Sequence, residues 1–158
     1  MKQPKHKLLI KQTGGKVIDS YESFHVACQE FPFKRLPEVK PLSARDLNDE
    51  NGEIVFIPSD GLKFKAYDLT AKFIYVGRET DMRRDLESFI SFLYGRNKGG
   101  SPVLSVYDEY TKTGRSGVYV QTVANDLYSV SDRDIDGIAI FSVGFRVTDP
   151  TSDIVLTK

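Results

Sequence analysis

The sequence is short of the residues from which most enzyme and metal sites are built. It holds one cysteine, Cys28, two histidines, His6 and His25, and no tryptophan. A single cysteine allows no internal disulfide, so the fold does not depend on an oxidising compartment. Two histidines are too few for a His-rich zinc site. Cys28 and His25 lie three residues apart in an expected strand, which places them on opposite faces, so we predict a buried thiol and a surface imidazole.

Surplus charge and long apolar runs are also missing. Lys and Arg number 22, as do Asp and Glu, and the net charge is zero. Surfaces that bind nucleic acid or anionic membranes generally carry positive charge, so neither specific nucleic-acid binding nor membrane binding is expected. The apolar run at residues 8–10 is too short for a signal peptide or a membrane span. With 40% hydrophobic and 28% charged residues, we expect residues 1–158 to form a single folded domain in the cytoplasm.

Hydrophobic periodicity predicts a mainly β fold. Apolar residues alternate with polar ones over 67–75 and again over 139–147, which indicates two long half-buried strands. Shorter strands are expected at 7–12, 16–18, 24–28, 53–57, 103–107, 117–123 and 154–156, with 108–116 as a hairpin loop. One helix is expected at about 80–95, with an apolar stripe of Met82, Leu86, Phe89, Ile90 and Leu93 and a stop at Gly95. We therefore predict a β-sandwich or open barrel of about seven or eight strands, with one packed helix.

Residues 31–51 do not fit either period. They include Pro32, Pro37 and Pro41, and irregular segments longer than about 12–15 residues are uncommon unless they are functional or disordered. We interpret the segment as an extended arm that ends at the turn dipeptide Asn51-Gly52. Its apolar side chains need a surface to cover them, and we predict that a neighbouring subunit supplies it. The predicted subunit interface is Phe31, Phe33, Leu36, Val39, Leu42 and Leu47.

One segment has the spacing of a metal loop. Asp132, Asp134 and Asp136, followed by Gly137, match the first half of a calcium loop, in which alternate carboxylates converge on the ion. The twelfth position is Val143 instead of glutamate, and a strand is expected where a helix should follow. A plain acidic turn explains the same residues. Calcium is the one cofactor that the sequence leaves open, and no catalytic constellation is present, so we predict that the chain is not an enzyme.

The order of elements after residue 67 has a counterpart among known families. The pieces are the strand at 67–76, the helix ending at 92–95, the strand at 103–107, the motif Gly114-Arg115-Ser116-Gly117 with its following strand, and the strand at 141–150. This order resembles the N-terminal domain of distal tail proteins of long-tailed, siphovirus-type bacteriophages, and tail-tube subunits of related fold. Distal tail proteins commonly continue into a second domain that carries receptor-binding proteins. Because the sequence ends soon after Pro150, we do not expect an adhesin platform.

The resemblance implies a virion structural protein with no active site. Its partners would be copies of itself, in a homo-oligomeric ring that the resemblance makes a hexamer, and other phage tail proteins. It would occupy the bacterial host cytoplasm during assembly and then the virion tail. We therefore expect a component of a phage or prophage tail that forms a ring at the tail tube or its distal end. The alternative is a stand-alone β-sandwich module that binds carbohydrate or a host protein.

Overall fold

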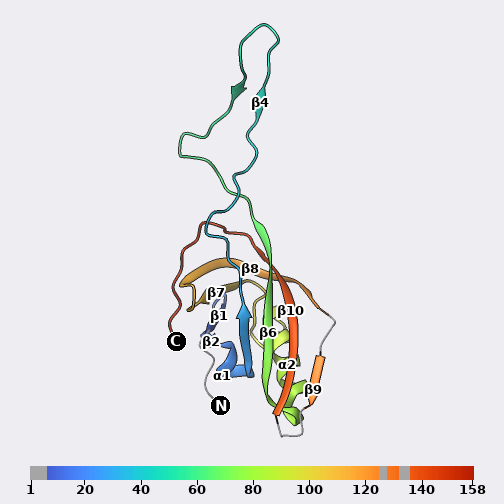
Figure 1. Cartoon of the computed structure of the whole chain (residues 1–158). Helices are drawn as coiled ribbons and strands as arrows, with labels where there is room; N and C mark the ends of the chain where they lie inside the picture. Colours follow the sequence, from blue (N-terminus) through green and yellow to red (C-terminus); the bar gives the residue numbers. More distant parts are fainter. Residues whose placement is uncertain (1–6, 125–127, 132–135) are drawn as a thin grey trace.

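A computed structural model of the chain describes residues 7–124, 128–131 and 136–158. One antiparallel sheet dominates this part of the chain, with the strand order β2-β1-β7-β8-β10-β6-β3 and β9 paired to the first half of β10 (Figure 1). The strands are β1 (Leu8–Gln12), β2 (Val17–Asp19), β3 (Val26–Glu30), β6 (Tyr67–Arg78), β7 (Leu104–Asp108), β8 (Thr113–Val123), β9 (Tyr128–Ser131) and β10 (Asp136–Val147). A small second sheet pairs β4 (Ala44–Arg45) with β5 (Ile54–Val55). The mainly β prediction is confirmed.

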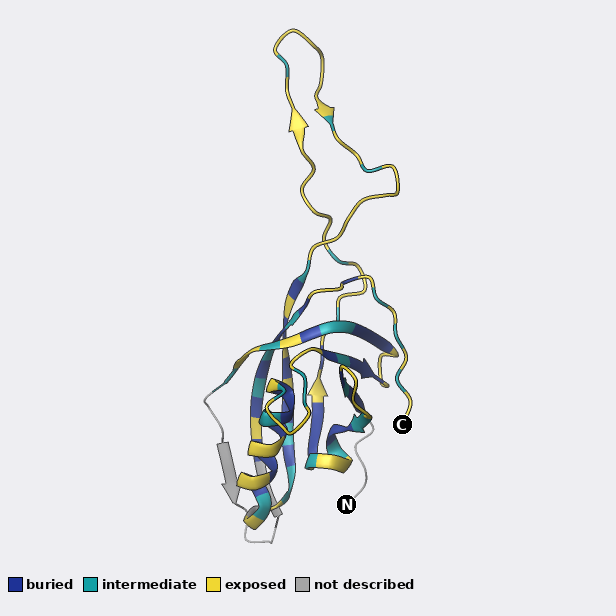
Figure 2. Ribbon diagram, turned by 180° about the vertical axis from the view of Figure 1, so that it is seen from behind, coloured by how far each residue is buried: buried dark blue, intermediate teal, exposed yellow. Residues whose placement is uncertain are grey.

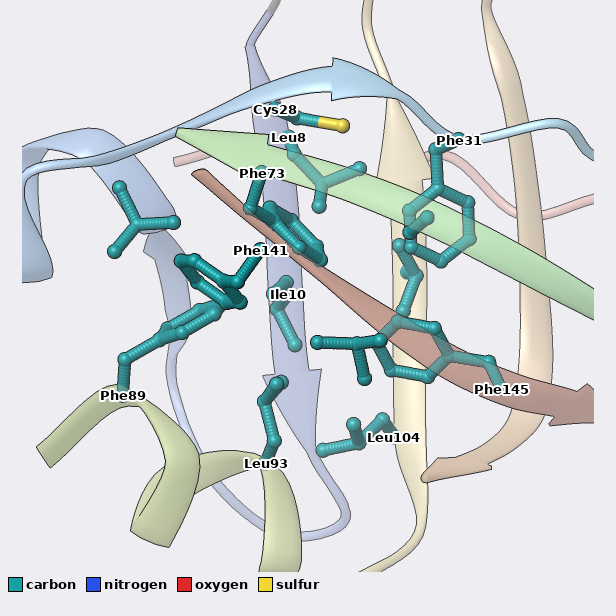
Figure 3. Close-up of a cluster of buried hydrophobic side chains, with 14 of the residues drawn as sticks. Leu8, Ile10, Cys28, Phe31, Phe73, Phe89, Leu93, Leu104, Phe141 and Phe145 are labelled. Atoms are coloured by element: carbon teal, nitrogen blue, oxygen red, sulfur yellow. The ribbon is translucent and has the colours of Figure 1, made fainter. Parts of the chain in front are cut away.

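The two long predicted strands are neighbours in the sheet. β6 and β10 pair along their full lengths, from Tyr67 opposite Val147 to Arg78 opposite Asp136. The odd-numbered residues 67–75 are buried, while their even-numbered neighbours are exposed or half-buried, because successive side chains in a strand point to opposite faces. The buried faces of both strands form the centre of the core, together with the side chains in Figure 3.

Helix α2 (Glu79–Tyr94) follows β6 directly and covers this core. The ring of Phe89 packs at a centroid distance of 5.4 Å from Phe73 and 6.1 Å from Phe141. Of the predicted stripe, Met82, Leu86, Phe89 and Leu93 are buried and Ile90 is half-buried. The helix ends at Gly95, whose φ of 71° lies in the left-handed region that glycine adopts without strain. The helix prediction is confirmed.

A short helix that the sequence did not indicate joins the two edges of the sheet. α1 (Ser20–Phe24) connects β2 to β3, and Asp19 caps it by accepting a 2.9 Å hydrogen bond from the Tyr21 N–H. Phe24 packs on Phe89 at 5.5 Å, so α1 also seals the space beside α2. The sheet therefore curls around its core as an open arrangement and not as a closed barrel.

Several predicted boundaries differ from the observed ones. The strand expected from Phe24 begins at Val26, because α1 occupies the preceding residues. The hairpin loop predicted at 108–116 contains only residues 109–112, since Asp108 accepts hydrogen bonds from the Tyr110 N–H and the Thr111 hydroxyl and tightens the turn. Residues 154–156 are not a strand; they belong to a C-terminal tail that crosses β8.

Candidate assembly surface

The most unusual part of the structure is a two-legged arm, residues 34–66, which projects away from the sheet (Figure 1). Its legs pair at Val39 and Phe64, where the Lys40 N–H donates to the Lys63 carbonyl at 2.7 Å. They pair again further out, at β4 and β5. The arm is longer than the predicted 31–51. Asn51-Gly52 forms the turn at its tip and not its end, so a second leg must return to β6.

Every residue of the arm is either exposed or half-buried, as Figure 2 shows. No residue of 34–66 is buried, although the segment carries large apolar side chains. Phe56 is 73% exposed and Ile57 61% exposed. More than half of the large apolar side chains that are exposed in the described residues lie on this arm: Leu36, Val39, Leu42, Ile54, Phe56, Ile57, Leu62 and Phe64. A concentration of exposed apolar side chains on one projection is typical of a surface that another molecule covers.

The structure divides the predicted interface residues into two groups. Leu36, Val39 and Leu42 are exposed on the outgoing leg, and Leu47 near the tip is half-buried. Phe31 is buried in the chain's own core, 5.1 Å from the ring of Phe145, and Phe33 packs on it at 4.7 Å. Phe31 therefore belongs to the chain's own core and anchors the arm, whereas Phe33 is half-buried beside it. The interface itself stays a prediction.

Sequence reasoning missed the apolar residues of the returning leg. The run from Ile54 to Ile57 contains four consecutive apolar residues, and we interpreted residues 53–57 as a short strand. β5 forms there and pairs with the short β4, and among the described residues no side chain of this two-stranded ribbon is buried. The signal that could have assigned these residues to the interface was an uninterrupted apolar run that lies outside the two alternating strands.

The Gly114-Arg115-Ser116-Gly117 motif fixes the base of the arm. Arg115 is 6% exposed, and its guanidinium donates to the carbonyl oxygens of Lys34 (3.2 Å) and Ser152. The Lys34 carbonyl begins the arm and Ser152 lies in the C-terminal tail, so one side chain holds both. A side chain at Gly114 would overlap the carbonyl oxygen of Ile154, where the tail crosses β8. The motif therefore determines the position from which the arm leaves the sheet.

A cleft of about 430 Å³ lies at this base, between the arm, the β7–β8 turn and the tail. We call it the arm-root cleft; Arg35, Leu36, Pro37, Phe64, Lys112, Thr113, Arg115, Thr151 and Asp153 line it. Arg35 donates to the Thr111 carbonyl, which ties the arm to the β7–β8 turn. The lining combines cations with exposed apolar groups, a composition suited to binding another chain.

Four titratable groups, Cys28, His25, Tyr75 and Asp85, lie in or beside the packed body of the chain. Burial raises the pKa of the Cys28 thiol far above its ordinary value, so this cysteine lacks the thiolate character of a nucleophile. The Asp85 carboxylate accepts a 2.9 Å hydrogen bond from the Tyr75 hydroxyl and lies 3.3 Å from Nδ1 of His25. Burial, and then this bond, raise the pKa of Tyr75. The three groups join the end of α1 to β6 and α2. As predicted, Cys28 is buried and His25 is exposed.

The calcium prediction falls mostly outside the described residues. Of Asp132, Asp134 and Asp136, the structure describes only the backbone of Asp136, which pairs with Arg78. Within the described ranges, no group of His, Cys, Asp or Glu side chains is arranged to hold a metal ion. No helix in these ranges is long and apolar enough to cross a membrane.

Comparison with known proteins identifies the fold. No protein-family model matches the chain, and no curated protein matches it. Among solved structures, it is similar to the crystal structure of the Dit protein of phage SPP1, described as a paradigm of the hub adsorption apparatus in phages that infect Gram-positive bacteria. The TM-score is 0.54 and the sequence identity 16%, over 90% of this chain and 50% of the SPP1 protein. The chain thus spans about half the length of SPP1 Dit and shares its fold over that half.

Proposed function

We propose that this protein is a structural component of a phage or prophage tail, which assembles with copies of itself into a ring at the tail tube or its distal end. The fold that it shares with SPP1 Dit supports a tail role. The observation that carries the proposal is the arm, a projection of residues 34–66 with no buried residue and with Leu36, Phe56 and Ile57 exposed to water. Covering those side chains with a neighbouring subunit releases the hydrophobic free energy that the isolated chain leaves unused.

The arm suits a head-to-tail contact. Each copy offers one arm and one body, so the arm of one subunit lies against the body of the next and the same contact repeats around the ring. Such a heterologous contact forms a closed ring when a whole number of subunit rotations completes a full turn. The family resemblance favours a ring of six subunits. The role is mechanical. The ring would then make further contacts with other tail proteins of the virion.

Removing the outer arm tests this proposal. Because the Lys40 N–H already bonds to the Lys63 carbonyl, residues 41–62 can be replaced by a short Gly-Ser linker without moving the base of the arm. We expect the wild-type protein to form larger species as its concentration rises, and the deletion variant to stay a folded monomer. Sedimentation velocity measures the assembly, and circular dichroism checks the fold. A control variant carries the same linker inserted after Lys98, in an exposed loop, and should assemble normally.

Each outcome separates the possibilities. Assembly of the deletion variant would show that the arm is not the interface. A deletion variant that unfolds would show that the arm stabilises the body. A wild-type protein that remains monomeric at every concentration would contradict the ring and favour the stand-alone binding module.

A further inference from the structure

The charges on the arm are unevenly distributed along its length. Residues 46–53, the acidic tip, contain no lysine or arginine and carry four exposed carboxylates: Asp46, Asp49, Glu50 and Glu53. Nearer the base, acidic and basic side chains pair with each other, Lys63 with Asp60 and Lys65 with Glu38. No ion pair to a carboxylate of the acidic tip occurs in the part of the chain that the structure describes. The tip therefore presents an uncompensated negative charge to the solvent.

The arm-root cleft has the opposite character. Arg35, Lys112 and Arg115 contribute three cations to its lining, against the single carboxylate of Asp153. The hydrogen bonds of Arg35 and Arg115 go to neutral backbone carbonyls, so their positive charge is not cancelled by a carboxylate among the described residues. Nε of Arg115 has no hydrogen-bond partner in the same residues. The cleft thus carries a net positive charge.

Apolar groups accompany the charges on both surfaces. In the cleft, Leu36 and Phe64 are exposed beside the cations. Leu47 lies among the carboxylates of the tip, and Ile54, exposed on β5, follows them directly. The two surfaces therefore match in both respects, an acidic edge with apolar neighbours against a basic cleft with apolar walls.

The tip and the base of the arm lie at its opposite ends, as Figures 1 and 2 show from two sides, and the cleft lies at the base. The paired legs hold them apart: Val39 pairs with Phe64 near the base, and Arg45 pairs with Ile54 further out. The complementary surfaces can therefore meet only between two copies. We infer that the acidic tip of one copy docks in the arm-root cleft of the next copy, which names the receiving surface for the ring contact and rests on the proposed function.

This contact gives the ring its direction. Each copy has one tip and one cleft, so every subunit in a closed ring donates once and receives once. Complementary charge mainly decides which surfaces meet and how quickly, whereas apolar side chains supply most of the affinity. The acidic tip would then specify the neighbour, and the exposed apolar residues of both legs would hold it.

Charge reversal provides the test. The tip variant carries Asp46→Lys, Asp49→Lys and Glu50→Lys, which makes the net charge of the tip positive. The root variant carries Arg35→Glu with Lys112→Glu, which makes the net charge of the cleft negative. Like charges placed together oppose binding, so each variant alone should assemble with a dissociation constant raised at least about tenfold. An equimolar mixture of the two should recover assembly, because every tip then meets a cleft of opposite charge. Lys16→Glu with Lys98→Glu makes the same charge change as the root variant at exposed sites away from the arm and should assemble like the wild type.

Sedimentation velocity at low salt measures the constants, and circular dichroism confirms that each variant is folded. If the root variant fails to fold, Lys112→Glu alone replaces it, since this side chain lies at an exposed turn. A tip variant that assembles with the wild-type constant would overturn the inference, and so would a mixture that does not recover. In both cases, loss of assembly in the arm-deletion variant would leave the proposed function standing. A wild-type protein that never assembles would overturn both.

Discussion

Replacing Phe56 and Ile57 with serine separates assembly from folding most directly. These neighbours lie on the returning leg and are 73% and 61% exposed, so most of each side chain is free to contact another subunit. Full burial of such a side chain stabilises by about 1.5–3 kcal/mol. Scaling by the exposed fractions gives about 1–2 kcal/mol for each residue, and about 2–4 kcal/mol for the pair. The dissociation constant of the assembly should therefore rise about 30- to 700-fold in the Phe56→Ser, Ile57→Ser variant.

Folding should respond differently. Neither side chain contributes to the core, so the free energy of unfolding of the monomer should change by less than about 0.5 kcal/mol. Sedimentation velocity over a concentration series measures the first quantity, and denaturant unfolding at low protein concentration the second. Val155→Ser is the control, because Val155 is 68% exposed but lies in the C-terminal tail.

The two measurements can fail independently. An unchanged dissociation constant in the double variant would remove the returning leg from the interface. A loss of several kcal/mol in the free energy of unfolding would show that the leg packs against its own body, contrary to the observed exposure. Weaker assembly of the Val155→Ser control would mean that the receiving surface extends along the C-terminal tail to Val155.

Three further predictions concern the body. Phe89→Ala should lower the free energy of unfolding by about 3–5 kcal/mol, and Arg83→Ala by less than about 0.5 kcal/mol, in denaturant titrations; equal small losses would contradict the packing of α2. Gly114→Ala should displace the tail that crosses at Ile154 and speed its proteolysis, whereas unchanged cleavage would show that the tail is not held there. If the segment from Asp132 to Asp136 binds calcium, millimolar calcium should raise the melting temperature and Asp134→Ala should abolish the rise. An unchanged melting temperature would leave a plain acidic turn.

The regular elements were predictable because their patterns are local. In β6, alternation decides the buried face, and in α2, apolar residues three and four apart do the same. The two patterns therefore predicted that Phe73 and Phe89 both face the core. In the structure their ring centroids lie 5.4 Å apart. The short helix α1 escaped prediction, since five residues are too few to show a helical period.

The arm shows where local signals stop. Its prolines and irregular pattern indicated a projection. A dipeptide such as Asn51-Gly52 marks a turn, but it does not show whether the chain then returns beside the segment that precedes it. The pairing of Val39 with Phe64 shows that the chain does return in this way. It joins residues from the two ends of the arm, so neither the outgoing nor the returning leg contains the information alone.

Phe31 and Leu36 show the same division most clearly. The sequence by itself determined that the proline-rich segment carries apolar side chains and has no regular period. It could not distinguish a phenylalanine that enters the core from a leucine that remains in water. Phe31 is buried because β10 brings Phe145 to within 5.1 Å of it, and Leu36 is exposed because the arm has already left the sheet. Burial depends on contacts between residues far apart in the chain, so only the tertiary structure separated the anchor of the arm from the surface that it offers to a partner.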